Sequence, residues 1–217
     1  MCPVDALQAR AKVDVAEVEV KRLGRVPYED TWRAMQTFNA SREPRTPDEI
    51  WLVEHPPVYT LGVAGRAAHL PRVDNGIAIV RTDRGGQITY HGPGQVIAYL
   101  MLDMKRRNLT VRPLVRLIES AVIDLLQRYG IAAARRTDAP GVYVGEAKIA
   151  ALGLRISRGC CYHGLALNVD MDLSPFHAID PCGFPGLSVT HLKALGVPDT
   201  PAAVAANLAE ALVGTLR

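Results

Sequence analysis

Apolar residues recur at helical spacing in two long stretches of the chain. Between residues 28 and 42, Trp32, Met35 and Phe38 are separated by polar residues, which predicts an amphipathic helix whose aromatic face belongs to the core. The same periodicity, sustained over more turns, predicts a second helix over residues 110–130. Two further helices are predicted near the C-terminus, one capped by Ser188 and ending near Gly196, and a last one opened by Thr200-Pro201.

Short apolar and alternating runs predict strands between these helices. Val96 to Met104 is nearly continuous apolar sequence, which is typical of a central strand covered on both faces. Because strands outnumber helices and often follow one another directly, the pattern indicates an α+β fold, a mixed and mainly antiparallel sheet with helices packed on one face. We expect a single domain over residues 1–217, with about residues 1–11 as a loose lead-in. The other predicted strands are residues 13–20, 50–55, 58–62, 77–81, 88–91, 142–144, 148–156 and 161–169.

Composition narrows the function classes. With 48% hydrophobic and 22% charged residues and a formal charge of +3, the chain has enough apolar material for a full core, and its scattered basic residues give little support to nucleic-acid binding. No apolar run is long enough to cross a bilayer, and the N-terminus lacks the apolar core of a signal peptide, so we expect a cytoplasmic protein without membrane contact. The four cysteines have neither zinc-site nor disulfide-framework spacing, so reduced thiols and no metal are expected.

A glycine-rich stretch, residues 84–95 (RGGQITYHGPGQ), follows one of the predicted strands. Its double glycine lets backbone approach a ligand with no Cβ in the way, and its Gly-Pro-Gly forces a sharp reversal. Between these turns, Thr89 and His91 are expected on one face of a strand, and Ile88 and Tyr90 on the other. We therefore predict that this stretch forms one wall of a ligand-binding site. The alternative is a hairpin whose glycines only turn the chain.

Four side chains are candidates for nucleophilic chemistry or its activation: two cysteines, a histidine and a lysine. Cys182 lies in a rigid glycine-flanked loop (DPCGFPG), where its sulfur can be exposed. Cys161 and His163, two residues apart, would share a strand face, although a buried structural cysteine is the more common outcome. A free thiol near neutral pH needs a neighbouring base or cation. Lys148, among small residues at a strand start, is a candidate for that partner, the alternative being a solvated surface lysine.

Four motifs occur in one order: residues 84–95, then KIAALG at 148–153, HGLALN at 163–168 and PCG at 181–183. Together they resemble the signature of the lipoyl(octanoyl) transferases, and the match runs from about Trp51 to Leu192. The resemblance implies the biotin/lipoate protein ligase-like fold. It implies a catalytic pair of Cys182, the acyl-accepting nucleophile, and Lys148. It also implies an acyl site lined by Arg84, Gly85, Gly86, Gln87, Ile88, Thr89, Tyr90, His91, Ala151, Leu152, Gly153, Gly164, Leu165 and Ala166.

The reaction that the resemblance implies is transfer of an octanoyl group from octanoyl-acyl carrier protein to a lysine ε-amine of a lipoyl domain. The acceptors would be 2-oxoacid dehydrogenase complexes and the glycine-cleavage H protein. A thioester on Cys182 would retain the energy of the donor bond, so neither ATP nor another cofactor is expected. Gly85, Gly86 and Gly164 would leave the acyl chain an unobstructed slot.

Three other functions compete with this reading. The nearest is an ATP-dependent lipoate- or biotin-type protein ligase, although the chain has neither a P-loop nor an Arg/Gly-rich adenylate motif. A non-enzymatic binding module would instead use the modest positive charge to bind carrier or lipoyl domains, and an active wild type with an inactive Cys182 variant would exclude it. A hydrolase built on Cys161 and His163 would carry the acyl label on Cys161.

Overall fold

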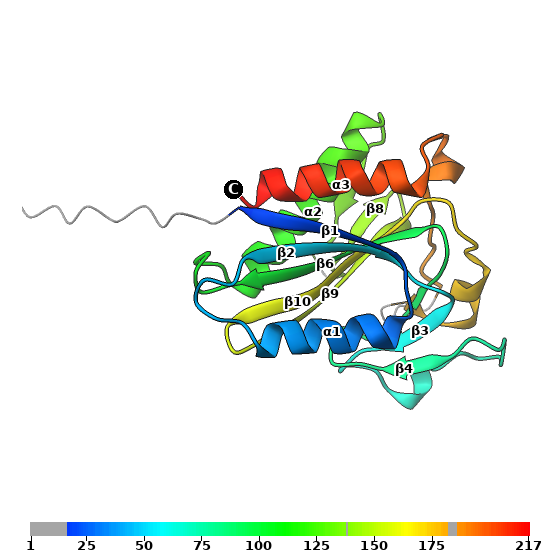
Figure 1. Cartoon of the computed structure of the whole chain (residues 1–217). Helices are drawn as coiled ribbons and strands as arrows, with labels where there is room; N and C mark the ends of the chain where they lie inside the picture. Colours follow the sequence, from blue (N-terminus) through cyan, green and yellow to red (C-terminus); the bar gives the residue numbers. More distant parts are fainter. Residues whose placement is uncertain (1–16, 138, 182–185) are drawn as a thin grey trace, which may run out of the picture.

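A seven-stranded sheet forms the centre of the computed structural model, which describes residues 17–137, 139–181 and 186–217 (Figure 1). The strand order is β1-β2-β6-β10-β9-β8-β7. Within it β1 and β2 are parallel, and every other neighbouring pair is antiparallel. The mixed, mainly antiparallel sheet is therefore confirmed. Its strands are β1 (Val18–Arg25), β2 (Asp48–Glu54), β6 (Gln95–Asp103), β7 (Ala134–Arg135), β8 (Val142–Val144), β9 (Ala147–Ser157) and β10 (Cys160–Asn168).

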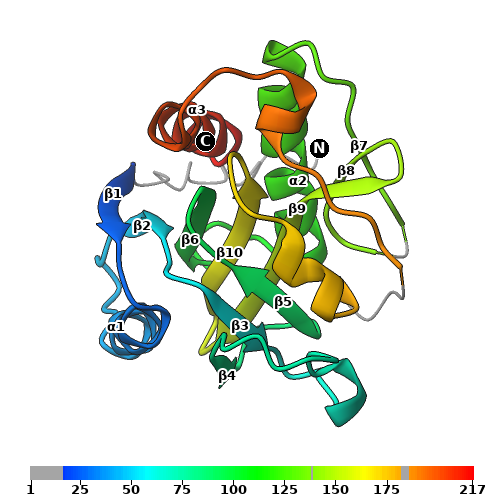
Figure 2. The ribbon, with the colours of Figure 1, turned by 90° about the vertical axis from the view of Figure 1, so that its right-hand side faces the viewer.

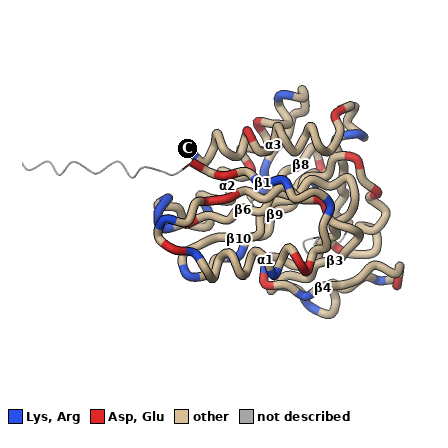
Figure 3. The backbone as a smooth tube through the Cα atoms, viewed as in Figure 1, with Lys and Arg blue, Asp and Glu red and all other residues tan. Residues whose placement is uncertain are grey.

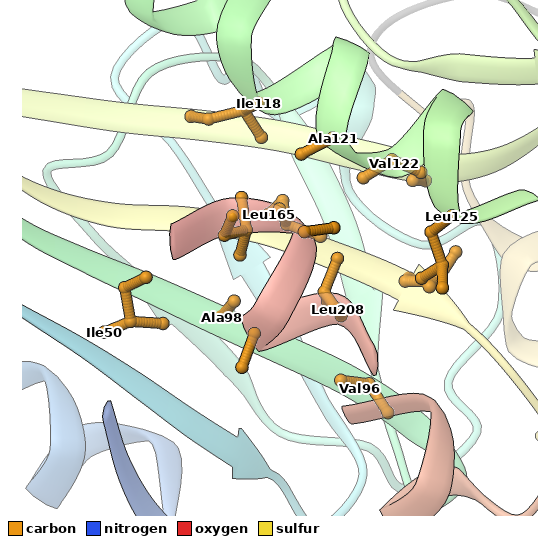
Figure 4. Packing of buried hydrophobic residues seen from close by; sticks show 14 of the residues in the cluster. Ile50, Val96, Ala98, Ile118, Ala121, Val122, Leu125, Leu165 and Leu208 are labelled. Atoms are coloured by element: carbon orange, nitrogen blue, oxygen red, sulfur yellow. The ribbon is translucent and has the colours of Figure 1, made fainter. Parts of the chain in front are cut away.

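Helices cover both faces of this sheet. Helices α2 (Val111–Arg128) and α3 (Pro201–Thr215) pack on one face, where Ala98 and Leu100 of β6 contribute to the largest apolar cluster (Figure 4). Helix α1 (Tyr28–Ala40) packs on the opposite face against Ile97 and Tyr99 (Figure 1). The expectation of helices on one face is thus wrong. The reason lies in β6, whose alternate residues are apolar on both sides and need a cover on each.

A second, three-stranded sheet carries the glycine-rich stretch. It has the order β4-β3-β5 (Figure 2), with β3 at Val58–Leu61, β4 at Ile79–Arg81 and β5 at Ile88–His91. Tyr90 of β5 packs in an apolar cluster with Tyr59, and the neighbouring short helix η2 (Ser174–Ala178) adds Phe176 to it. This packing fixes the stretch between the small sheet and the edge of the large one. A further short helix, η1, covers Ala67–His69.

The C-terminal helix begins as predicted, but the short helix before it does not. Thr200 Oγ1 accepts a hydrogen bond of 3.3 Å from the Ala203 amide at the start of α3. The short helix η4 (Leu192–Leu195) is capped by His191, whose Nδ1 accepts from the Ala194 amide at 3.0 Å. Ser188 instead lies in extended chain outside the helix, where its carbonyl accepts a hydrogen bond from the Lys148 amide of β9. The prediction of Ser188 as a cap is therefore wrong.

Charged residues of both signs alternate along the backbone, and basic residues gather at the end of the sheet where α1 leads into β2 (Figure 3). There Arg42, Arg106 and Arg107 surround the buried carboxylate of Asp48. Burial favours the protonated acid, but hydrogen bonds from the Asp103 amide and the Arg107 guanidinium outweigh it and hold the pKa of Asp48 below its usual range. The cluster ties the α1–β2 connection to the β6–α2 connection. Among the helices described here, none combines the length and apolarity that crossing a membrane requires.

Candidate active site

A pocket that is partly open to solvent lies where the loop before β5 meets β9 and β10. It brings together twelve of the fourteen residues predicted for the acyl site, drawn from three distant parts of the sequence. The predicted residues that line it are Arg84, Gly86, Gln87, Ile88, Thr89, His91, Ala151, Leu152, Gly153, Gly164, Leu165 and Ala166. Sequence reasoning missed four further lining residues, Tyr28, Ile97, Tyr99 and His163.

The two predicted residues outside the lining have structural roles nearby. The Gly85 amide donates to the Leu154 carbonyl at 2.9 Å, which joins the glycine-rich stretch to β9. The Tyr90 ring faces away from the pocket and lies 5.5 Å from the Phe176 ring. The alternation expected for β5 places His91 toward the pocket and Tyr90 in the apolar cluster of the small sheet, as its period of two requires.

Gly164 lines the pocket, but its lack of a side chain serves strand packing. A Cβ at this position would stand 1.9 Å from the Ala98 carbonyl oxygen in the neighbouring strand β6. A Cβ on Gly85 would likewise meet the Leu154 carbonyl oxygen, at 3.3 Å. The expectation that these glycines clear a slot for the acyl chain is therefore corrected, since both let backbone segments approach each other.

The side chain of Arg84 fixes the conformation of the glycine-rich loop. Its buried guanidinium donates to Thr60 Oγ1 at 3.0 Å, to the Gly85 carbonyl at 2.8 Å and to the Gln87 carbonyl at 2.9 Å. Because these acceptors come from both β3 and the loop itself, one side chain fixes the loop against the small sheet. Arg84 thus shapes the pocket wall.

Two buried histidines beside the pocket are uncharged at neutral pH. Burial is the main cause that lowers the pKa of His91 to about 3 and that of His55 to about 4. Gln95 Nε2 donates to Asn168 Oδ1, so Gln95 Oε1 is the acceptor for the His91 Nδ1–H at 2.7 Å. The histidines therefore add hydrogen-bonding groups to this region without adding charge, which suits an apolar ligand.

Asp83 binds the pocket-lining residue His163 and was not predicted as part of the site. Its carboxylate accepts hydrogen bonds from Trp32 Nε1 at 2.8 Å, from the Tyr162 hydroxyl and from His163 Nε2 at 2.9 Å. Burial favours the protonated form, but these donors outweigh it and hold the pKa of Asp83 far below its usual range. The carboxylate thereby fixes helix α1 and strand β10 in relation to the pocket.

The proposed pairing of Cys161 with His163 is not formed. His163 has a φ of +63°, which interrupts the alternation of β10, and its ring lies 6.1 Å from the Tyr99 ring. Cys161 is buried in the cluster beneath α2 and α3, on the other face of the sheet. Burial also raises the pKa of its thiol well above the usual value. Cys161 is therefore a structural residue.

Lys148 is buried at the start of β9, with 3% of its surface exposed. Its Nζ donates to the Pro140 carbonyl at 3.2 Å and lies 5.2 Å from the centre of the Tyr143 ring. Its backbone is fixed as well, because its amide donates to the Ser188 carbonyl at 2.8 Å and its carbonyl accepts from the Thr190 amide at 3.0 Å. The alternative of a solvated surface lysine is excluded.

A smaller cavity, lined in part by Lys148, lies next to the larger pocket. Lys148, Thr89, Ala151 and Pro181 line it, and two of these, Thr89 and Ala151, also line the larger pocket. Cys182 follows Pro181 in the sequence but lies outside the described residues, so its pairing with Lys148 stays a prediction. Within the described part of the chain, no cluster of three or more His, Cys, Asp or Glu side chains could hold a metal ion.

Comparison with known proteins defines the class of this fold and site. The family described as "Lipoyl protein ligase A/B catalytic domain" matches residues 27–213, and the chain belongs to that family. Its backbone resembles a putative lipoate protein ligase from Thermoplasma acidophilum with bound lipoic acid (TM-score 0.74, 19% identity, 92% of this chain and 86% of that one). A biotin protein ligase from Aquifex aeolicus aligns with a TM-score of 0.58 and 12% identity, over 91% of this chain and 70% of that one.

Curated relatives narrow the class further. The chain is 66% identical over 181 residues to a protein named octanoyltransferase from Dechloromonas aromatica, covering 83% of this chain and 88% of that protein. It is 62% identical over 197 residues to an octanoyltransferase from an Azoarcus species, covering 91% and 87%. The resemblance inferred from the four motifs, and the ligase-like fold that it implied, are confirmed.

Proposed function

We propose that the chain is an octanoyltransferase that moves an octanoyl group from octanoyl-acyl carrier protein to a lysine ε-amine of a lipoyl domain. The observation that carries the proposal is the buried amine of Lys148 in a cavity that shares Thr89 and Ala151 with an apolar pocket. A confined amine beside a pocket for a fatty chain suits acyl transfer at the head of that chain. The relatives at 56–66% identity, all named octanoyltransferase, favour the same reaction.

In the first step the thiolate of Cys182 attacks the thioester carbonyl of the donor, and the sulfur of the carrier protein leaves as a thiolate, which takes up the proton that Cys182 had given up. In the second step the lipoyl-domain amine attacks the new thioester, which releases the Cys182 sulfur and one proton. Lys148 would either hold the thiolate by its positive charge or accept the thiol proton. If the two groups are in contact they would titrate as a coupled pair, so both roles belong to the proposal. Either role requires the amine to be held still, as its bond to the Pro140 carbonyl does.

The pocket supplies affinity for the acyl chain. Burying the six methylenes of an octanoyl group would contribute about 5 kcal/mol before losses, at about 0.8 kcal/mol per methylene. Neutral His55 and His91 keep ionic charge away from the chain. We further propose that the acceptors are the lipoyl domains of 2-oxoacid dehydrogenase complexes and the glycine-cleavage H protein. We place the reaction in the cytoplasm, where thiols stay reduced.

ATP-dependent ligation is the second candidate, because the fold is shared with lipoate and biotin protein ligases. The two functions differ in whether transfer needs ATP. We expect the purified chain to octanoylate a lipoyl domain from octanoyl-carrier protein with ATP omitted, as followed by the mass of the acceptor. Transfer from free octanoate that depends on ATP would instead identify a ligase.

Matched variants test the catalytic pair in the same assay. Cys182→Ser and Lys148→Ala should each abolish transfer, because one removes the proposed nucleophile and the other its partner. Cys160→Ser is the control, since this half-buried thiol lies at the start of β10 and lines neither cavity. Full activity in Cys182→Ser would rule out Cys182 as the nucleophile.

A further inference from the structure

We propose that Glu119, in the middle of helix α2, positions the amine of Lys148 through the turn at residues 139–141. The inference rests on the proposed function, because it takes Lys148 as a member of the catalytic pair. Glu119 is 4% exposed, although it belongs to a helix whose buried residues are otherwise mostly apolar. A buried carboxylate is costly unless it is hydrogen-bonded, so its partners indicate what it does.

The turn lies directly against the lysine side chain. Its Pro140 carbonyl accepts the hydrogen bond from Lys148 Nζ at 3.2 Å. A Cβ added to Gly141 would stand 3.0 Å from Lys148 Cε and 3.3 Å from Nζ. Gly141 also has a φ of +143°, which L side chains rarely adopt. Glycine at this position therefore lets the backbone pass close beside the amine, and the position of the turn fixes the position of Nζ.

Glu119 holds that turn from the helix side. Its Oε1 accepts a hydrogen bond from the Gly141 amide at 3.0 Å, and this bond is buried. Its other oxygen lies 3.7 Å from Arg135 Nε, an ion pair at the partly exposed rim. The Gly141 N–H and the Pro140 carbonyl that binds Lys148 Nζ belong to the same peptide group. A single peptide unit thus connects the carboxylate of α2 to the catalytic amine.

Tyr143 holds the other end of the same turn. Its hydroxyl donates to the Ala139 carbonyl at 3.0 Å, and its ring faces Lys148 Nζ at 5.2 Å. With Tyr143 alone, the turn would be fixed at residue 139 and free to shift at Gly141. The bond to Glu119 removes that freedom, so the carbonyl that binds the amine is anchored on both sides.

Loss of the Glu119 acceptor should therefore affect catalysis more than substrate binding. It leaves the Gly141 amide unsatisfied in a buried place, and the turn moves to find another acceptor. The Pro140 carbonyl moves with it, and the Lys148 amine is displaced together with this acceptor. The acyl pocket does not involve these residues, so the affinity for the acyl donor should be preserved.

The test compares Glu119→Ala, Glu119→Gln and Asp124→Ala in the octanoyl transfer assay. We expect Glu119→Ala to lower kcat by about tenfold or more with KM nearly unchanged, because small misplacements of a catalytic group have effects of that size. Glu119→Gln keeps an acceptor oxygen for the Gly141 amide and should stay within about threefold of wild type. Asp124→Ala removes an exposed carboxylate from the same helix and should change nothing.

The pH dependence of Cys182 alkylation separates positioning from mere stability. If Lys148 is misplaced, Glu119→Ala should shift this profile to higher pH, whereas a variant that is only less stable keeps the wild-type profile. Wild-type kcat and profile in a folded Glu119→Ala would overturn the inference, and so would equal losses in Glu119→Ala and Glu119→Gln. If Glu119→Ala does not fold, Glu119→Asp takes its place, because aspartate keeps the negative charge on a side chain one methylene shorter. A lowered kcat at wild-type KM in Glu119→Asp would support the inference, and a wild-type kcat would overturn it.

Failure of the proposed function would look different. An active Lys148→Ala would remove the lysine from the catalytic pair, whatever Glu119 does. An inactive Lys148→Ala together with a fully active Glu119→Ala would overturn only the positioning role.

Discussion

Substituting Ala151 by Leu should shorten the acyl chain that the enzyme accepts. Ala151 lies in β9 opposite Ala166 of β10 and lines both the acyl pocket and the Lys148 cavity. A fatty chain that reaches from one space into the other must pass this position. The leucine side chain adds three carbons at this position, and the acyl chain can no longer occupy the space that they fill.

The size of the effect follows from the methylenes displaced. If three chain carbons lose their burial, octanoyl transfer loses about 2.4 kcal/mol, which is about 60-fold in kcat/KM. A butanoyl chain is too short to need the lost space and should be affected far less. The ratio of octanoyl to butanoyl kcat/KM should therefore fall by about 60-fold.

The assay measures kcat/KM for carrier proteins loaded with butanoyl, hexanoyl and octanoyl groups. Ala147→Leu is the matched control, because it adds the same volume to the same strand at a residue that lines neither cavity. An equal fall for all chain lengths would indicate a general packing defect. An unchanged preference for octanoyl would show that the chain does not pass Ala151, and would refute the placement of the acyl site.

Two further predictions concern stability. Gly164→Ala should destabilise the fold by about 1–3 kcal/mol or more, because its Cβ would lie 1.9 Å from the Ala98 carbonyl oxygen. The control is Gly214→Ala in helix α3, whose Cβ would meet nothing within 4 Å, and which should be neutral or stabilise the fold by up to about 1 kcal/mol. Equal urea unfolding midpoints for the two variants would contradict the predicted difference. His55 and His91 have folded-state pKa values of about 4 and 3, below the ordinary 6.5, so the unfolded chain binds protons first as the pH falls. The free energy of unfolding should therefore be greatest above pH 6.5 and should fall toward pH 4 by about 1.4 kcal/mol per pH unit for each histidine. Urea unfolding at several pH values measures this fall, and a free energy that does not change with pH would contradict the prediction.

Much of the site could be predicted from sequence because its residues carry local signals. The glycines of residues 84–95 mark turns, and the period of two in β5 correctly separates His91 from Tyr90. Lys148 is a lone lysine among small residues, which favours a confined site, and it is buried. These features depend on neighbours in the chain, so one segment is enough to indicate them.

Other parts of the site depend on contacts that no segment contains. Asp83 looks like an ordinary turn residue, and its importance comes from Trp32 and His163, 51 and 80 positions away. His163 was expected to share a strand face with Cys161, but its positive φ breaks the alternation. The periodicity of residues 110–130 predicts a helix but gives no role to Glu119, because its partner amide belongs to a different element.

The placement of helices was missed for a related reason. A strand that is apolar at every position between its two ends, as β6 is, indicates that both faces are covered but not which element covers each. Helix α1 could be assigned to the face opposite α2 and α3 only from its contacts with Trp51 and Tyr99. Such pairings between distant elements are set by the whole core.

We infer that the octanoyl group is bound covalently to this chain on its way from donor to acceptor. The most direct test of this inference is the intact mass of the purified protein after mixing with octanoyl-carrier protein and no acceptor. The account predicts one octanoyl group per chain, released by hydroxylamine as a thioester is, present in Cys160→Ser and absent from Cys182→Ala. An octanoyl group that persists at full yield in Cys182→Ala, or wild-type transfer with no acylated chain at any time, would contradict it.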